Sequence, residues 1–280
     1  MASYRTSSVF HFTAQYELLK KIIKQGIIPN YCEEDLSFDE TDFCVGIPMA
    51  CFCDIPITLL DEHTGRYGKY GVALTKEWAR KNGLNPVMYI TNNEVIRSVY
   101  YYHENVQAML NDEQSMVNGL WMGCGPGNIN RRLCAGEIAQ RLGALQEHFI
   151  NLHIIGYLKK YDSNTTNNYE ENEWRYLVPE NDETKWFWSR EGYMKWSNPD
   201  NKTKEEVKKP APSPNLCQHT LKFETKDISY ILVKDATYKA RMIQLIKKLT
   251  SVGGNKITDA HLRDDLISKV ITLEQVKRDF

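Results

Sequence analysis

The sequence lacks an excess of either charge sign and lacks long apolar runs. Its 35 Lys and Arg residues face 36 Asp and Glu residues, for a net charge of −1. No global field therefore draws the chain to nucleic acid or to a membrane, and a nucleic-acid partner would need a local basic patch. No stretch approaches the ~20 apolar residues that span a bilayer, and the N-terminus has no apolar run of signal-peptide length. We expect a cytoplasmic protein without membrane contact.

Paired cysteines and the commonest catalytic motifs are also missing. The seven cysteines are odd in number, and Cys51-Phe-Cys53 suits neither a zinc ribbon nor a thioredoxin-like motif. We interpret them as reduced thiols that mostly fill the core, and we expect no metal. The chain has no G-x-G-x-x-G after a strand, no P-loop, no H-E-x-x-H, no G-x-S-x-G and no kinase set. These absences argue against several large enzyme classes.

Strand-like and helix-like patterns alternate along the chain. Residues 8–13 predict a strand, and the apolar spacing after them predicts a helix that Gly26 ends. Residues 33–46 are acidic and loop-like, and Thr75 is a plausible N-cap. Further expected segments are strands at 47–56 and 85–90, two strands within 219–235, helices at 92–118, 137–160 and 236–250, a glycine-rich irregular stretch at 119–136, and a last helix in the tail.

The composition and this order of elements favour an α+β fold. Apolar residues make up 42% and charged residues 25% of 280 residues, which is ordinary for a soluble globular protein with a proper core. Strands at both ends of the chain with helices between them predict one domain over 1–280. We expect its core at about 8–178 and 219–235, a variable loop at 180–215, and a helical tail at 236–280.

The stretch NNYEENEWRYLV, residues 167–178, carries the most suggestive chemistry. If it is a strand, Glu171 and Glu173 point to the same side, whereas Glu170 points to the other. Two carboxylates on one face perturb each other's pKa values and can stabilise the oxocarbenium-like state of glycosidic cleavage. The alternative is a solvated acidic strand edge, which is what charge clusters usually are.

Two further groups of residues have both a functional and a structural interpretation. His11 lies between two phenylalanines in a strand-like run, with Thr13 on the same face, and a lone histidine is more often an ordinary packed or surface residue. In GRYGKYG, residues 65–71, glycines frame Tyr67 and Tyr70, which offer flat faces for stacking. A tight turn with two packed tyrosines is the alternative.

A basic and aromatic run follows the acidic stretch. Such runs suit single-stranded nucleic acid, because bases stack on the rings while cations hold the phosphates. A packed subdomain is an equally good interpretation. The run comprises Trp186, Trp188, Tyr193 and Trp196 with Lys185, Arg190 and Lys195.

Several motifs resemble known families. VFHFT followed by LLKKIIKQGIIP resembles the opening of ADP-ribosyltransferase folds, especially DNA-modifying DarT-like toxins. PMACFCDIPITLLDEHTGRYGKYGVALTKEWARKNGLNPVMYI, residues 48–90, resembles AbiGi-type abortive phage-resistance proteins. ENEWRYL matches the place where these families carry a Glu before Trp-Arg. The resemblance implies a split mixed or antiparallel sheet with helical insertions and a helical C-terminus.

The resemblance also implies a catalytic pair. Glu173 falls on the catalytic Glu, which would bond the nicotinamide ribose and stabilise the oxocarbenium ion as nicotinamide leaves. Glu171 would orient or deprotonate the acceptor. The middle motif, Cys51-Phe-Cys53-Asp54, departs from the Ser-Thr-Ser of the arginine-modifying branch. The departure leaves open which tyrosine stacks on nicotinamide and what kind of target is modified.

The same resemblance assigns the residues that would bind NAD, the co-substrate. His11 would hydrogen-bond the adenosine ribose, and Thr13 would help to seat the dinucleotide. Tyr70 would stack on nicotinamide, with Tyr67 as its competitor. Glu171 and Glu173 should face His11 and Tyr70 across a cleft, which His63 would also line. No metal is needed.

The implied function is an NAD-dependent mono-ADP-ribosyltransferase toxin of an abortive-infection or toxin–antitoxin system. We expect nucleic acid as its target, RNA ahead of DNA, and an antitoxin or chaperone partner that restrains it. The alternatives are a protein-targeting transferase, an enzyme that hydrolyses NAD, and a non-catalytic antitoxin or interaction component with a degenerate transferase fold.

Overall fold

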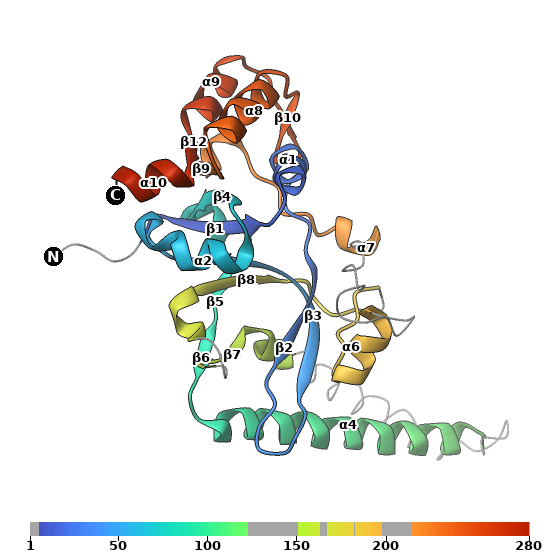
Figure 1. The fold of residues 1–280 in the computed structure, drawn as a ribbon. Coiled ribbons are helices and arrows are strands. Elements are labelled where there is room, and N and C mark those ends of the chain that lie inside the picture. Colours follow the sequence, from blue (N-terminus) through green and yellow to red (C-terminus); the bar gives the residue numbers. More distant parts are fainter. Residues whose placement is uncertain (1–5, 123–150, 163–166, 182, 198–213, 280) are drawn as a thin grey trace.

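A mixed β-sheet with helices packed on it organises the chain (Figure 1). The computed structural model describes residues 6–122, 151–162, 167–181, 183–197 and 214–279. The predicted α+β class is confirmed. Of the irregular stretch expected at 119–136, residues 119–122 continue a helix and the rest lies outside the described residues, as do the first residues of the helix expected at 137–160.

The strands of the main sheet follow an order far from their order in the chain. Neighbouring strands are antiparallel except for β12 and β9, which are parallel. From one edge to the other the sheet contains β12 (Val270–Thr272), β9 (Ile228–Val233), β4 (Tyr70–Thr75), β1 (Ser8–Thr13), β3 (Cys44–Cys53), β8 (Glu173–Leu177) and β5 (Asn85–Pro86), while β2 (Asn30–Asp35) also pairs with β3.

The sheet is split between β1 and β3. β1 pairs with β4 along its whole length, from Ser8 opposite Thr75 to Thr13 opposite Tyr70. Its pairing with β3 is a single register position, Phe10 opposite Cys53. β3 then leaves β1 and pairs with β2 and β8 instead, so that one long strand joins two half-sheets (Figure 1). The sheet therefore shares the split and mixed outline that was expected.

Helices cover the two faces of the first half-sheet. One face carries α1 (Tyr16–Gln25), α3 (Lys76–Lys81), α8 (Ala236–Lys247) and α9 (His261–Ser268), whose buried side chains form one core with the sheet. The opposite face packs against α2 (Leu60–Tyr67), α10 (Leu273–Asp279) and the 3₁₀ turn η1 (Ile57–Leu59) that precedes α2. This burial of apolar surface on both faces is the main stabilising contribution to the half-sheet.

The second half-sheet has its own core. Ile47 and Met49 of β3 pack with Ile96 of the long helix α4 (Asn93–Met122) and with buried Trp186. Smaller elements complete this half: β6 (Met88–Ile90) pairs in parallel with β7 (Leu158–Lys160), and the 3₁₀ turns η2 (Asn151–Tyr157) and η3 (Asn168–Glu171) and the helices α6 (Arg190–Ser197) and α7 (Pro214–Cys217) lie nearby. Near α1, β10 (Ser251–Val252) and β11 (Asn255–Lys256) form a short hairpin, and η4 (Thr225–Asp227) precedes β9.

Two local signals in the sequence are confirmed. Gly26 ends α1 with φ at 97° and ψ at −178°, a conformation open to glycine and costly for other residues. Thr75 caps α3, because its Oγ1 accepts a hydrogen bond from the backbone N–H of Trp78 at 3.2 Å. Both features are set by residues within one turn, which is why the sequence alone identifies them.

The acidic segment expected as a loop at 33–46 contains strands. β2 covers 30–35, and β3 begins at Cys44 and ends at Cys53, not at Pro56. Arg190 explains how an acidic strand is tolerated, since it bonds Glu33 at 2.7 Å and Asp35 at 3.1 Å. The prediction of a loop at 33–46 was wrong because it relied on the acidic charge of the segment alone.

Three other expectations are wrong in detail. The strand expected at 85–90 is two short pieces, because β5 pairs with β8 whereas β6 pairs in parallel with β7. Within 219–235 only β9 is a strand, and the earlier part forms isolated bridges. The tail holds β12 between α9 and α10, where one helix was expected, because its apolar side chains complete the sheet edge beside β9.

Substituting Gly26 by Ala tests the backbone at the end of α1. An added Cβ would meet the carbonyl oxygen of Leu221 at 2.6 Å, in a conformation that costs a non-glycine residue about 1–3 kcal/mol. Urea unfolding should show a loss of at least that size. The matched control is Gly65→Ala in α2, where no atom lies within 4 Å of the new Cβ and helix propensity favours Ala by about 0.5–1 kcal/mol. Equal stability of the two variants would contradict the assignment.

Candidate active site: a buried carboxylate cluster

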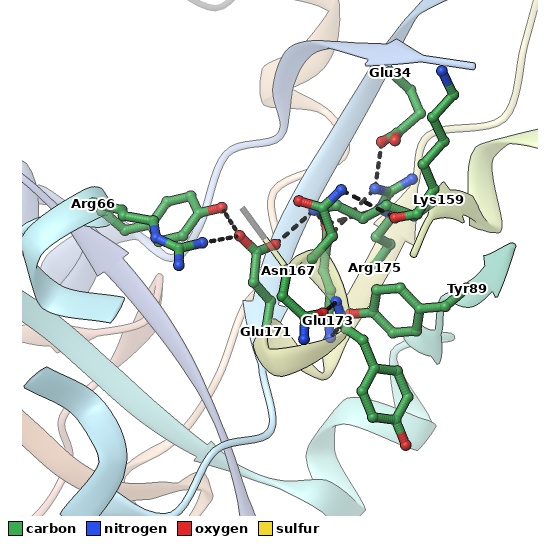
Figure 2. Close-up of polar contacts among 12 residues, drawn as sticks. Glu34, Arg66, Tyr89, Lys159, Asn167, Glu171, Glu173 and Arg175 are labelled. Atoms are coloured by element: carbon green, nitrogen blue, oxygen red, sulfur yellow. Dashed lines mark hydrogen bonds and ion pairs between the residues drawn. The ribbon is translucent and has the colours of Figure 1, made fainter. Parts of the chain in front are cut away.

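The acidic stretch is a turn followed by a strand. Residues 168–171 form η3, Asn172 takes the left-handed conformation with φ at 41°, and β8 starts at Glu173. The expectation that alternation along one strand aligns Glu171 and Glu173 is therefore wrong. The two carboxylates nevertheless converge: Lys159 Nζ donates to Glu171 Oε2 at 2.6 Å and to Glu173 Oε2 at 2.7 Å (Figure 2).

A buried arginine holds Glu173 from the other side. Arg175 is 1% exposed, and its Nε donates to Glu173 Oε1 at 2.8 Å while its Nη2 donates to Glu173 Oε2 at 3.1 Å. The same Nη2 bonds Glu34 of β2, and Nη1 donates to the carbonyl of Gly156 at 2.7 Å. Both oxygens of Glu173 are thus engaged by cations (Figure 2).

Both oxygens of Glu171 are also bound, by Tyr67 and Arg66 on one side and by the shared Lys159 on the other. The hydroxyl of Tyr67 donates to Glu171 Oε1 at 2.5 Å, and Arg66 Nη1 lies 3.4 Å from the same oxygen. Lys159 binds the second oxygen. Glu171 and Glu173 are each only 6% exposed. We call the set the carboxylate cluster; its members are Glu34, Glu171, Glu173, Lys159 and Arg175, with Tyr67 at its edge.

Burial and neighbouring charges shift the pKa values of three members of the cluster. Burial by itself would raise the pKa of Glu173, but the charge and hydrogen bonds of Arg175, together with Lys159, lower it to about 2. Burial likewise opposes the charge on Lys159, yet Glu173, Glu34 and Glu171 raise its pKa well above the ordinary value. Burial raises the pKa of Glu34, against the opposing effect of Arg175. Glu173 is therefore held as an anion by its neighbours.

Two expected ligand residues lie beside the cluster. His63 and Tyr67 come from one face of α2, with their ring centroids 4.5 Å apart, and His63 also contacts Phe12 at 5.3 Å. Burial lowers the pKa of His63 to about 4, so the ring is neutral at pH 7. Burial and the hydrogen bond to Glu171 raise the pKa of Tyr67, which is 42% exposed. His63 and Tyr67, with exposed Arg66 between them in the sequence, are the part of the site that solvent reaches.

The other three expected ligand residues lie on the opposite face of the sheet. Phe10, Cys53 and Glu173 are register partners and share one side, so His11, next along β1, faces the other. The His11 ring lies 5.3 Å from Phe52, and its Nδ1 contacts the carbonyl of Cys51 at 2.8 Å. The expectation that His11 looks at Glu173 across a cleft is wrong.

Tyr70 and Thr13 share the face of His11. They are opposite each other in the β1–β4 ladder. The Tyr70 ring is buried against Tyr16 at 5.7 Å and Tyr238 at 5.1 Å, in the core beneath α1 and α8. Tyr70 therefore cannot stack on a ligand at Glu173 in this arrangement. Tyr67 is the tyrosine beside the carboxylates.

The basic and aromatic run forms a packed subdomain. Trp186 is 4% exposed and its ring centroid lies 5.8 Å from that of Trp188, while the Trp196 ring is tilted against Tyr31 with centroids 4.3 Å apart. Arg190 is occupied by the acids of β2 and by Asp42. The interpretation of this run as a stacking surface for single-stranded nucleic acid is not supported, and the packed alternative is confirmed.

Four charged members of the site were not anticipated from the sequence. They are Glu34, Arg66, Lys159 and Arg175. Arg175 had a usable signal, because it stands two residues after Glu173 in a strand and shares its face. Lys159 and Glu34 come from segments far from β8 in the chain, and no local pattern places them there.

The described part of the chain shows neither a metal-binding group of side chains nor a membrane-spanning helix. Within it, no group of three or more His, Cys, Asp or Glu side chains is arranged to hold a metal ion. Over the same residues, no helix combines the length and apolar character that crossing a bilayer requires.

The fold and the site define an α+β protein with a split mixed sheet and a buried carboxylate cluster. No solved structure matches it. The family model described as "Putative abortive phage resistance protein AbiGi, antitoxin" matches residues 25–234, three quarters of the chain, which therefore belongs to the AbiGi family. Abortive phage resistance protein AbiGi of Lactococcus lactis subsp. cremoris is 26% identical over 245 residues, covering 84% of this chain and 89% of that protein. The expected resemblance to AbiGi-type proteins is confirmed, and the expected ADP-ribosyltransferase fold stays a prediction.

Replacing Lys159 by Met tests the bridge between the two glutamates. The variant leaves two buried carboxylates without their shared cation, and breaking a buried ion pair costs about 3 kcal/mol or more. The matched control is Lys160→Met, because its side chain lies on the other side of β7. Urea unfolding should show the large loss for Lys159→Met and less than about 1 kcal/mol for the control. Similar losses in both would mean that the bridge does not stabilise the fold.

The depressed pKa of Glu173 predicts a pH dependence of stability. A carboxyl whose pKa falls from 4.5 to about 2 on folding stabilises the protein above its unfolded pKa. This contribution, about 3 kcal/mol, is lost as the pH falls from about 5 to 2. Glu173→Gln lacks the titration, so the stability gap between wild type and variant should narrow over that interval. Unfolding curves at pH 7, 5, 4 and 3 measure it, and a constant gap would contradict the assignment.

Proposed function

We propose that this chain is the antitoxin-side component of an abortive phage-resistance system, and that it acts by binding a protein partner. The observation that carries the proposal is the state of the carboxylate cluster. Each oxygen of Glu171 and Glu173 is engaged by Lys159, Arg175 or Tyr67, and both side chains are buried. We therefore interpret the carboxylates as members of buried ion pairs that stabilise the fold.

Catalysis by this arrangement would require a costly rearrangement. A catalytic Glu must come within about 2.6–3.2 Å of the substrate group on which it acts. To free an oxygen of Glu173, Arg175 or Lys159 would have to give up an ion pair in a buried position. Leaving such a charge unpaired costs several kcal/mol. The expected NAD ligands His11, Thr13 and Tyr70 also point to the face of the sheet opposite Glu173, which supports a non-catalytic role.

The comparisons support the same conclusion. The family description contains the word antitoxin, and the lactococcal relative is named for abortive phage resistance. An antitoxin needs a toxin to restrain, so the expected partner is a toxin protein. The sequence predicted a toxin that an antitoxin partner restrains. Under this proposal the roles are exchanged, and this chain restrains the toxin.

Co-expression tests the proposal. The chain alone should leave bacterial growth unchanged, and it should restore growth to cells that express a toxin encoded beside it. The two proteins should elute as one complex in size-exclusion chromatography. Tyr67→Phe should act like wild type, because it removes one hydrogen bond to Glu171 at the edge of the cluster while Lys159 and Arg66 still bind that carboxylate. Growth arrest by this chain alone, relieved by Glu173→Gln, would overturn the proposal.

A second candidate function is the NAD-dependent mono-ADP-ribosyltransferase expected from the sequence, with RNA ahead of DNA or protein as acceptor. One observation favours it: Glu171, Glu173, Tyr67 and His63 lie together on one side of a split sheet, and Glu173 is held as an anion. An anion is what an oxocarbenium ion requires. Under this proposal Tyr67, not Tyr70, contacts the nicotinamide of NAD.

Labelled NAD separates the two candidates. Purified protein is incubated with NAD labelled in the adenylate part and with separate RNA, DNA and protein fractions. The antitoxin proposal expects no transfer and no loss of NAD. Transfer that falls at least tenfold in Tyr67→Phe would establish the transferase, and free ADP-ribose alone would indicate an NAD glycohydrolase. Tyr193→Phe is the matched control, because it removes a tyrosine hydroxyl from the subdomain around Trp196, on the face of the β2–β3 ladder opposite Glu34.

A further inference from the structure

A basic groove runs between α1 and α8, on the face of the sheet opposite the carboxylate cluster. The two helices lie side by side at one end of the molecule (Figure 1), and Tyr16 of α1 contacts Tyr238 of α8 with ring centroids 5.0 Å apart. The groove has a volume of about 540 Å³. Its walls include Tyr16 and Lys20 from α1 and Arg241, Gln244 and Lys248 from α8 and its cap.

The charge of these walls differs from that of the whole chain. Among the residues that line the groove, Lys20, Arg241 and Lys248 are cations and Glu17 is the single acid, although the net charge of the protein is −1. Lys20 bonds Glu17 at 2.8 Å on the exposed rim, where such a pair contributes little. The groove is therefore a local positive patch, the feature that a nucleic-acid partner of this chain was expected to need.

Two cations of the groove lie beside tyrosine rings, Tyr16 in the wall and Tyr238, which packs against Tyr16. Lys20 Nζ lies 5.9 Å from the centre of the Tyr16 ring, and the Arg241 guanidinium lies 5.1 Å from that of Tyr238. A positive groove that holds phosphates beside aromatic faces is typical of proteins that bind single strands. The Gln244 amide adds a donor and an acceptor for sugar or base groups.

We propose that this groove binds single-stranded nucleic acid through its phosphates. The groove is open, so a mononucleotide would remain largely exposed, whereas a strand gains affinity from several phosphates at once. Only unpaired bases can present a face to Tyr16. The groove and the carboxylate cluster lie on opposite faces of the sheet. Binding in the groove is therefore compatible with either an antitoxin or a transferase.

Fluorescence anisotropy with the full-length protein tests the proposal. The probes are labelled 12-nucleotide RNA and DNA of mixed sequence and a duplex of the same sequence, at 50–200 mM salt. Both single strands should bind more tightly than the duplex. With three phosphates neutralised, log K should fall against log salt with a slope of about −2. The triple variant K20Q/R241Q/K248Q should bind at least tenfold more weakly and lose most of that slope.

A matched variant controls for general charge. K185Q/K195Q/K226Q removes three cationic side chains that are exposed and lie outside the groove, and it should bind like wild type. Lys248→Gln alone, at an exposed position, should weaken binding severalfold and keeps the test valid if the triple variant unfolds in a thermal melt. No binding by wild type, equal binding by the groove variants, a preference for duplex, or stronger competition by poly-glutamate than by unlabelled RNA would overturn the proposal.

Discussion

The buried guanidinium of Arg175 is the interaction on which the second half-sheet depends. A charge that is 1% exposed is tolerated only if every donor finds an acceptor, because an unpaired buried charge costs several kcal/mol. Its acceptors come from three segments: Glu34 on β2, Glu173 on β8 and the carbonyl of Gly156 before β7. Their relative positions are thereby fixed by one side chain, and Lys159 extends the same constraint to the turn that carries Glu171.

This constraint bears directly on function. An oxocarbenium-stabilising carboxylate has to be ionised and also reachable, and the two requirements conflict in this cluster. The cations that keep Glu173 ionised also occupy its oxygens, and burial prevents water from replacing them at low cost. His63 and Tyr67 remain reachable: the imidazole is neutral and only a weak base, and the phenol, which bonds Glu171, keeps its proton because its pKa is raised. This conflict supports the proposed role in binding a partner.

Local signals could be predicted from the sequence, and long-range placement could not. Gly26 and Thr75 end and begin their helices through contacts within a turn, and Glu173 was correctly assigned to a strand. Alternation correctly placed His11 opposite its phenylalanine neighbours. It could not show that Glu173 lies on the phenylalanine side, because that depends on the single pairing of Phe10 with Cys53 and on the ladder from Cys53 to Glu173. The turn at Asn172 could not be predicted either, because asparagine adopts the left-handed conformation but many others as well.

The two faces of the sheet carry different electrostatics, and this separation limits what one ligand can do. On one face, opposite charges neutralise each other inside the carboxylate cluster, so little field reaches solvent there. On the other face, the cations of α1 and α8 have few acids beside them, so the groove keeps a positive potential. β1 and β4 separate the two regions with buried apolar side chains on both sides. A polyanion held by Lys20, Arg241 and Lys248 would therefore lie away from Glu173, so the groove and the cluster are more simply explained as separate sites than as two parts of one catalytic centre.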